Sequence, residues 1–154
     1  MKLGDISETP AELIVDLLAL DAPGCCGAFA GMSEENLERI MKLDFCMPGS
    51  DGNALPAEYV FGRAHPRAFG TVPKFLRKLL ELNIPVGEVV RRATGLPAQT
   101  FKLSDRGIIA EGTLADLVLF DPDELADRAD FASPHTPADG IVFTMSRGEI
   151  VYRR

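Results

Sequence analysis

Apolar residues recur at helical spacing through the first two thirds of the chain. The clearest helix start is Thr9-Pro10-Ala11-Glu12, where a capping threonine precedes a proline at the first helical position and a glutamate at the capping-box position. Leucines follow at intervals of three and four, and the helix is expected to end by Asp21. The same pattern predicts a second helix that opens at Ser33, and others over residues 71–82, 86–94 and 97–101.

Short, continuous apolar runs predict buried strands at residues 25–30 and 43–47. Beyond Ser104 the pattern changes to Val- and Leu-rich runs separated by turn residues, which predict strands at residues 108–110, 115–120, 141–145 and 149–152. Ser146-Arg147-Gly148 has the composition of a tight hairpin between the last two of these strands. We therefore expect an α/β chain whose helix-and-strand part, residues 1–103, is followed by a small β-rich part, residues 104–154.

One polar stretch, residues 48–67, follows the predicted strand at 43–47. Its Gly-Ser-Asp-Gly places Asp51 between two glycines, whose backbone freedom permits a sharp turn at the mouth of a loop. Such a carboxylate is suited to catalysis or metal binding, although an Asp-Gly turn that merely caps a strand has the same local pattern. The stretch closes on His65-Pro66-Arg67. His135 lies in a polar, proline-bearing loop and is expected to be solvated.

Composition narrows the possible partners and location. The chain has 154 residues and 46% hydrophobic residues, enough for one domain with a real core. Its formal charge of -7, without a basic cluster, argues against binding nucleic acid or an anionic membrane surface. No apolar run is long enough to span a membrane, and the N-terminus lacks the apolar core of a signal peptide. With three cysteines, two of them adjacent, we expect a reducing, cytoplasmic setting.

Several short motifs stand in a specific order along the chain. They are Met-Ser-Glu-Glu at 32–35, Gly-Ser-Asp-Gly at 49–52, Ala-His-Pro-Arg-Ala-Phe-Gly-Thr at 64–71, Ala-Thr-Gly-Leu-Pro-Ala at 93–98, Asp-Arg-Gly-Ile-Ile-Ala-Glu-Gly at 105–112 and Ala-Asp-Leu-Val-Leu-Phe-Asp at 115–121. In this order they resemble the C-terminal portion of a metal-dependent amidohydrolase. The His-Pro-Arg with Gly-Thr downstream resembles the N-acyl-D-amino-acid deacylase, or D-aminoacylase, branch.

This resemblance implies a fold for each part of the chain. Family members combine a (β/α)8 barrel with a small β-sandwich built from both chain ends. Residues 1–103 would then form the last βα units of the barrel, and residues 104–154 the C-terminal part of the β-sandwich. Residues 43–48 would be the eighth barrel strand, with Asp51 at its C-terminal end, which is the catalytic face of such barrels.

The resemblance also implies roles for three residues. In the family a zinc-bound water attacks the amide carbonyl of an N-acyl-D-amino acid. Asp51 would contact that metal and its water, and would act as general base and then as general acid. Arg67 would hold the α-carboxylate of the D-amino acid, because guanidinium presents two parallel donors to a carboxylate. His65 is expected to shape the substrate loop rather than to bind metal.

The remaining metal ligands of the family are not found in this sequence. There is no His-x-His pair, and the chain has only two histidines, so we expect the chain alone to bind no zinc. A complete barrel also needs about 200–250 residues. The chain is therefore either a fragment, one half of a split enzyme, or a stand-alone domain that kept the scaffold.

Two functional hypotheses follow. The first is a partial amidohydrolase that cleaves the N-acyl amide bond of N-acyl-D-amino acids once a missing N-terminal half supplies the metal. The second is a non-catalytic structural or interaction module derived from the same scaffold. In either case the strands at 25–30 and 43–47 would expose sheet edges and apolar faces, so we expect a rearranged fold, a partner chain or self-association to cover them.

Overall fold

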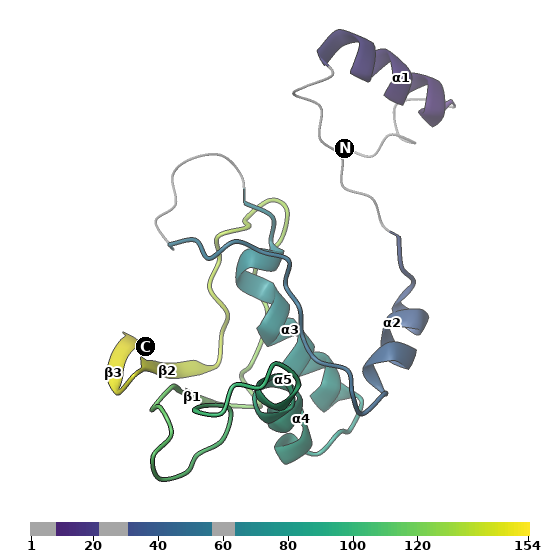
Figure 1. Ribbon diagram of the computed structural model, residues 1–154. Coiled ribbons are helices and arrows are strands. Elements are labelled where there is room, and N and C mark those ends of the chain that lie inside the picture. The colour runs from purple at the N-terminus through teal and green to yellow at the C-terminus, as the bar shows by residue number, and fades with distance from the viewer. Residues whose placement is uncertain (1–8, 22–30, 57–63) are drawn as a thin grey trace. The chain divides into compact units, whose positions relative to one another are not determined.

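The computed structural model describes residues 9–21, 31–56 and 64–154. The chain divides into two compact units, Met1–Ser33 and Glu34–Arg154 (Figure 1). The described part of the first unit is dominated by helix α1, Pro10–Asp21, which confirms the helix predicted from its capping sequence. The strand predicted at residues 25–30 lies outside the described residues.

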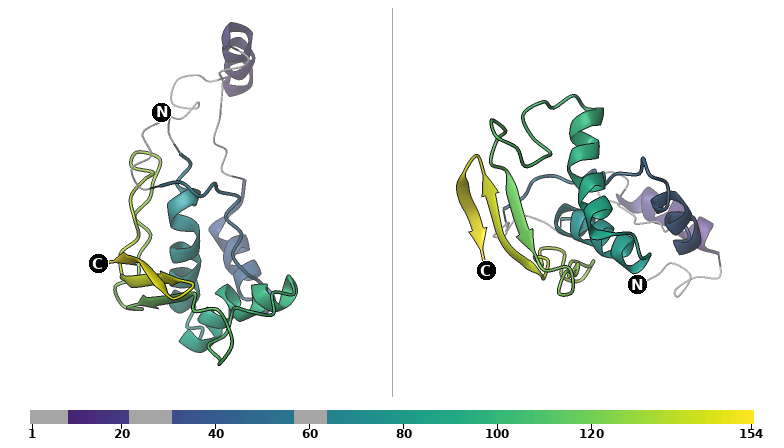
Figure 2. Two further views of the ribbon diagram at one scale, coloured as in Figure 1. Left: turned by 60° about the vertical axis from the view of Figure 1, so that its left-hand side comes forward. Right: turned by 90° about the horizontal axis from the view of Figure 1, so that it is seen from below.

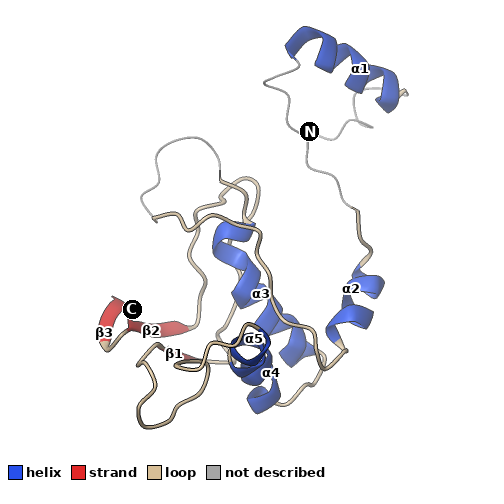
Figure 3. Ribbon diagram, in the orientation of Figure 1, coloured by secondary structure: helices blue, strands red, loops and turns tan. Residues whose placement is uncertain are grey.

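Four helices precede the strands of the second unit (Figure 3). They are α2 (Glu34–Met41), α3 (Arg67–Glu81), α4 (Val86–Ala93) and α5 (Gly95–Thr100). Leu79, Val89 and Leu125 are the largest fully buried side chains, and they pack with Met41 and Phe75 into one core. The core therefore joins α2, α3 and α4 to the segment that follows the first strand. None of the described helices is both long and apolar enough to cross a lipid bilayer.

Helix boundaries follow the positions of proline. Helix α3 begins at Arg67, four residues before the predicted start, because Pro66 already has helical dihedral angles (φ −52°, ψ −27°). Helices α4 and α5 are separated only by Thr94, whose φ of −130° interrupts the helical path. Pro97 lies in the first turn of α5, where its missing N–H would have no helical partner in any case.

The sheet is antiparallel, with strands in the order β1-β2-β3. Strands β1 (Leu117–Phe120), β2 (Ile141–Ser146) and β3 (Glu149–Arg153) confirm three of the four strands predicted after residue 104. Arg147 and Gly148 turn the β2–β3 hairpin with φ of 49° and 86°, as the tight-hairpin prediction requires. The three strands form a layer beside the helices, seen in the right-hand view of Figure 2.

The strand predicted at residues 108–110 is wrong. The carbonyl of Ala110 accepts hydrogen bonds from the Thr113 hydroxyl (2.8 Å) and the Thr113 N–H (3.3 Å), and the carbonyl of Ile108 accepts one from the same hydroxyl (3.3 Å). These bonds fold the segment into a turn. The apolar run Ile108-Ile109 is exposed on that turn instead of entering the sheet.

The strand predicted at residues 43–47 is also wrong, and two arginines explain why. Arg92, which is buried, donates from Nη1 to the carbonyl oxygens of Met41 and Leu43, both at 2.8 Å. Arg91 donates to the carbonyl of Asp44 at 3.0 Å. The carbonyl oxygens that would bond to a neighbouring strand are thus bound by arginines of α4. The segment forms turns instead of a strand. The segment that leads to Asp51 is therefore anchored on α4.

Candidate functional site

The structure brings together all three site residues predicted from the sequence. Arg67, the first residue of α3, makes an ion pair with Asp51, with 3.0 Å between Nη2 and Oδ2. The backbone N–H of Arg67 donates to Nδ1 of His65 at 3.1 Å. Asp51 and His65 thus contact the same residue at the start of α3, one through its side chain and the other through its backbone.

Local backbone geometry explains how Asp51 reaches this position. Asp51 has a φ of 47°, in the left-handed region that aspartate tolerates better than most residues. The Ser50 hydroxyl accepts a hydrogen bond from the N–H of Gly52 at 3.1 Å, which closes the turn. A Cβ at Gly52 would lie 3.0 Å from Cα of Ala68, so the loop packs tightly on the first turn of α3. The Gly-Ser-Asp-Gly motif therefore sets the approach of Asp51 to Arg67.

The Asp51–Arg67 pair is open to solvent. The Asp51 side chain is 89% exposed and that of Arg67 is 44% exposed. An ion pair in such a setting contributes little to stability, because water and salt screen it. The guanidinium can therefore exchange Asp51 for another carboxylate at small cost. Chemically, the pair offers one cationic fork for an acidic ligand and one carboxylate able to take up a proton.

His65 is fixed by contacts that come from a distant part of the chain. Its ring meets that of Phe131 edge to face, with 5.0 Å between the ring centroids and an interplanar angle of 80°. Nearby, the ring of His135 stacks on Phe69 at 5.6 Å. The prediction of a solvated His135 is therefore wrong, since the residue is half-buried against α3. Sequence spacing gave no sign of these contacts, which join residues more than sixty positions apart.

The described residues do not form a metal centre by themselves. Within residues 9–21, 31–56 and 64–154, no three His, Cys, Asp or Glu side chains come together in a way that could hold a metal ion. A zinc site needs three or four protein ligands, so Asp51 would be one contributor among ligands supplied elsewhere.

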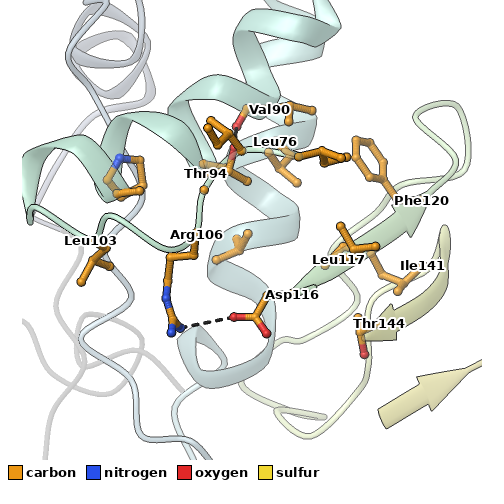
Figure 4. Close-up of a pocket in the computed structure, with 18 of the residues that line it drawn as sticks. Leu76, Val90, Thr94, Leu103, Arg106, Asp116, Leu117, Phe120, Ile141 and Thr144 are labelled. Atoms are coloured by element: carbon orange, nitrogen blue, oxygen red, sulfur yellow. Dashed lines mark hydrogen bonds and ion pairs between the residues drawn. The ribbon is translucent and has the colours of Figure 1, made fainter. Parts of the chain in front are cut away.

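A separate, largely apolar pocket of about 620 Å³ lies between the helices and the sheet (Figure 4). Leu76 and Val90 line it from the helices, and Phe120 and Ile141 line it from the sheet. Its polar side is closed by an ion pair between Arg106 Nη1 and Asp116 Oδ2, at 3.2 Å. None of the three candidate site residues lines this pocket, so the two features are distinct.

Comparison with known proteins identifies the family. The sequence model of the amidohydrolase family matches residues 64–152, more than half of the chain. The chain belongs to the amidohydrolase family. This confirms the resemblance drawn from the ordered motifs, and the matched region begins one residue before His65.

Curated relatives of this amidohydrolase act on N-acylated D-amino acids, by their names. The chain is 36% identical over 126 residues to the N-acyl-D-glutamate deacylase of Alcaligenes xylosoxydans xylosoxydans, covering 80% of this chain and 25% of the relative. It is 39% identical over 124 residues to the D-aminoacylase of the same organism, covering 79% and 25%. The amidohydrolase chain thus spans about a quarter of the length of these relatives.

Solved structures show the same relationship. A crystal structure of D-aminoacylase matches with a TM-score of 0.70 at 39% identity. The N-acyl-D-glutamate deacylase of Bordetella bronchiseptica, complexed with zinc and a phosphonate inhibitor, matches with a TM-score of 0.69 at 37% identity. Each match covers 79% of this amidohydrolase and 25% of the solved chain. The chain therefore has the fold of the corresponding part of an amidohydrolase.

Proposed function

We propose that this chain is the C-terminal part of a metal-dependent amidohydrolase that hydrolyses the N-acyl amide bond of N-acyl-D-amino acids. The observation that carries the proposal is the convergence of Asp51, His65 and Arg67 at the start of α3, joined by a 3.0 Å ion pair and a 3.1 Å hydrogen bond. The names of the relatives supply the substrate class.

Each residue has a distinct role in this proposal. Arg67 binds the α-carboxylate of the substrate through two parallel N–H donors. Asp51 takes a proton from the attacking water and returns it to the leaving amine. His65 holds the loop before α3 by accepting the Arg67 N–H. Zinc, as in the Bordetella bronchiseptica complex, would supply the activated water when bound, with ligands other than Asp51 coming from the polypeptide that completes the site.

We further propose the division of the chain into two parts. Residues 1–103 would correspond to the last βα units of the barrel, with residues 43–47 in turns instead of the eighth strand, and residues 104–154 to the C-terminal part of the β-sandwich. The change from helices to antiparallel strands between α5 and β1 supports this boundary. On this view another polypeptide, or another copy of the chain, covers apolar side chains that the second unit exposes.

A non-catalytic interaction module is the alternative, and the exposed apolar side chains favour it. Ile109 is 89% exposed, Phe101 70% and Val151 65%. Scattered apolar residues are normal on a surface, but here they lie on the turn before β1, after α5 and on the edge strand β3, and Ile109 also lines the apolar pocket. A module of this kind would bind its partner without turnover.

Replacing part of a known D-aminoacylase with this chain distinguishes the hydrolase from the interaction module. The chain would replace the aligned quarter of the Alcaligenes xylosoxydans xylosoxydans D-aminoacylase, and hydrolysis of N-acetyl-D-amino acids would be measured together with bound zinc. We expect activity in the grafted enzyme. Asp51→Asn should lower kcat by about 10²–10⁴-fold, as expected for loss of a general base. Arg67→Ala should raise KM by roughly 10–100-fold, the equivalent of about 1.5–3 kcal/mol for hydrogen bonds to a charged group.

A second exposed ion pair provides the matched controls. Arg154 and Glu124 lie 2.6 Å apart, with exposures of 56% and 51%. Arg154→Ala and Glu124→Gln should leave kcat and KM unchanged. A folded, zinc-loaded graft without turnover would favour the interaction module. If Asp51→Asn leaves kcat unchanged, Asp51 is not the general base.

A further inference from the structure

The segment between the first two strands contains a loop with its own internal scaffold. This loop, residues 127–138, is called the aromatic loop below. Its base is closed by an antiparallel bridge between Ala126 and Asp139, with N–O distances of 3.4 and 3.0 Å. Arg128 adds an ion pair to Asp139 at 2.6 Å. The base of the loop is therefore held by its own contacts, independently of what the tip contacts.

Two aspartates fix the interior of the aromatic loop. The Asp130 carboxylate accepts hydrogen bonds from the N–H groups of Ala132 (2.8 Å) and Ser133 (2.6 Å). The Asp127 carboxylate accepts one from the N–H of Ala129 at 2.9 Å. Such local bonds between side chain and backbone define a turn without a sheet or a helix. The tip that bears Phe131 is consequently ordered by the loop itself.

The aromatic loop packs against the first turn of α3 and the residues just before it, at three points. Phe131 meets His65, His135 stacks on Phe69, and the Asp127 carboxylate lies directly against Gly70. Gly70 is buried, and a Cβ there would overlap that carboxylate. In Figures 1 and 2 the segment between β1 and β2 rises beside the start of α3. The contacts therefore surround Arg67 along the chain, two positions before it and two and three positions after it.

These contacts reach the backbone of Arg67, at the start of its side chain, through His65. Because Nδ1 of His65 accepts the N–H of Arg67, that nitrogen carries no proton, and the neutral ring has its proton on Nε2. The edge-to-face contact with Phe131 restrains the ring in this orientation. We propose that the aromatic loop positions Arg67 for carboxylate binding, through Phe131 on His65 and His135 on Phe69.

This inference rests on the proposed role of Arg67, but its first test does not. The chain contains only two histidines, so the ring nitrogen signals of His65 and His135 can be assigned in the full chain by NMR with one His135→Gln variant. In Phe131→Leu the Nδ1 signal of His65 should move from the value of an accepting nitrogen toward the mean of the two tautomers. Phe131 is 59% exposed, so the substitution should leave the fold intact by circular dichroism.

Two variants make the comparison specific. Phe131→Tyr keeps the aromatic face and should preserve the wild-type His65 signals. Phe101→Leu removes another exposed phenylalanine, 70% exposed and far along the chain from the loop, and should also leave them unchanged. A His65 spectrum that is the same in Phe131→Leu and wild type would overturn the proposal.

Kinetics in the grafted enzyme distinguish this inference from the proposed function. Phe131→Leu should raise KM for the N-acetyl-D-amino acid about 10-fold with little change in kcat, because a misplaced anchor weakens binding of the substrate. Phe131→Tyr should restore the wild-type KM. If Arg67→Ala raises KM and Phe131→Leu does not, the positioning role is wrong. If Arg67→Ala leaves KM unchanged, the role proposed for Arg67 fails, whereas the NMR result still decides whether the loop holds His65.

Discussion

Glu88 is the most strongly perturbed acid among the described residues. Its carboxylate accepts hydrogen bonds from Arg91 at 2.6 Å and from Arg92 at 2.7 Å. These bonds, that from Arg91 first, lower the pKa of Glu88 from 4.5 to about 2. The same two arginines donate to the carbonyls of Met41, Leu43 and Asp44, so the charge on Glu88 holds both guanidinium groups where they can bind this segment.

The lowered pKa of Glu88 predicts a loss of stability in acid. The unfolded chain, with a Glu88 pKa near 4.5, takes up the proton before the folded chain does. The contribution of Glu88 to the free energy of unfolding is therefore complete above about pH 4.5 and is lost as the pH falls toward 2. Urea unfolding of wild type and Glu88→Gln should give curves that converge over this interval. Parallel curves from pH 6 to pH 2.5 would contradict the prediction.

At the scale of elements, two glycines with nearly the same φ, Gly140 and Gly148, are required for different reasons. Gly140, which precedes β2, has a φ of 80°, and a Cβ there would lie 2.6 Å from backbone atoms of Leu125. Gly148, in the β2–β3 turn, has a φ of 86° with open space around it. Gly140 is thus needed both for its dihedral angles and for the close approach of two chain segments, whereas Gly148 is needed only for its dihedral angles.

This difference predicts two sizes of effect for the same substitution. Gly148→Ala should lower the free energy of unfolding by about 1–2 kcal/mol, the cost of a left-handed conformation for alanine. Gly140→Ala should lower it by more than about 3 kcal/mol, because the backbone at Leu125, which is buried in the core, must also move. Urea unfolding of both variants measures the difference, and equal losses would show that the close approach costs nothing.

The second unit as a whole leaves apolar surface in contact with water. Among the described residues, β1 and β3 form the two edges of the sheet, and all residues of β3 are exposed. Edges of this kind pair readily with other chains. We therefore predict that the purified 154-residue chain self-associates at micromolar concentration and binds an apolar dye.

Charge placed on this surface should weaken self-association. Ile109→Lys and Val151→Lys should each lower the mean mass measured by light scattering, since both replace exposed apolar side chains. Gln99→Lys adds the same charge at an exposed polar position and serves as the control. A monodisperse wild-type monomer without dye binding would show that the exposed surface is not adhesive.

Local sequence patterns predicted several helices and strands of this molecule correctly. Helix α1 follows from its capping sequence, and the β2–β3 hairpin from Ser146-Arg147-Gly148. Asp51, His65 and Arg67 were selected by motif order, and the structure brings them into contact. The predicted strand at 43–47 failed because Arg91 and Arg92, almost fifty positions away, take its carbonyl groups. Phe131 was missed for the same reason, since no local pattern reports a contact across sixty-six positions.

The Asp51–Arg67 ion pair has a consequence for the order of events on this surface. Arg67 is already occupied by a carboxylate from its own chain, so an incoming acid is a competitor as well as a ligand. In the proposed function, a substrate carboxylate that takes two parallel donors of the guanidinium would displace Asp51 and free its side chain for other groups. Binding of the substrate carboxylate and release of Asp51 would then be coupled in a single exchange at Arg67.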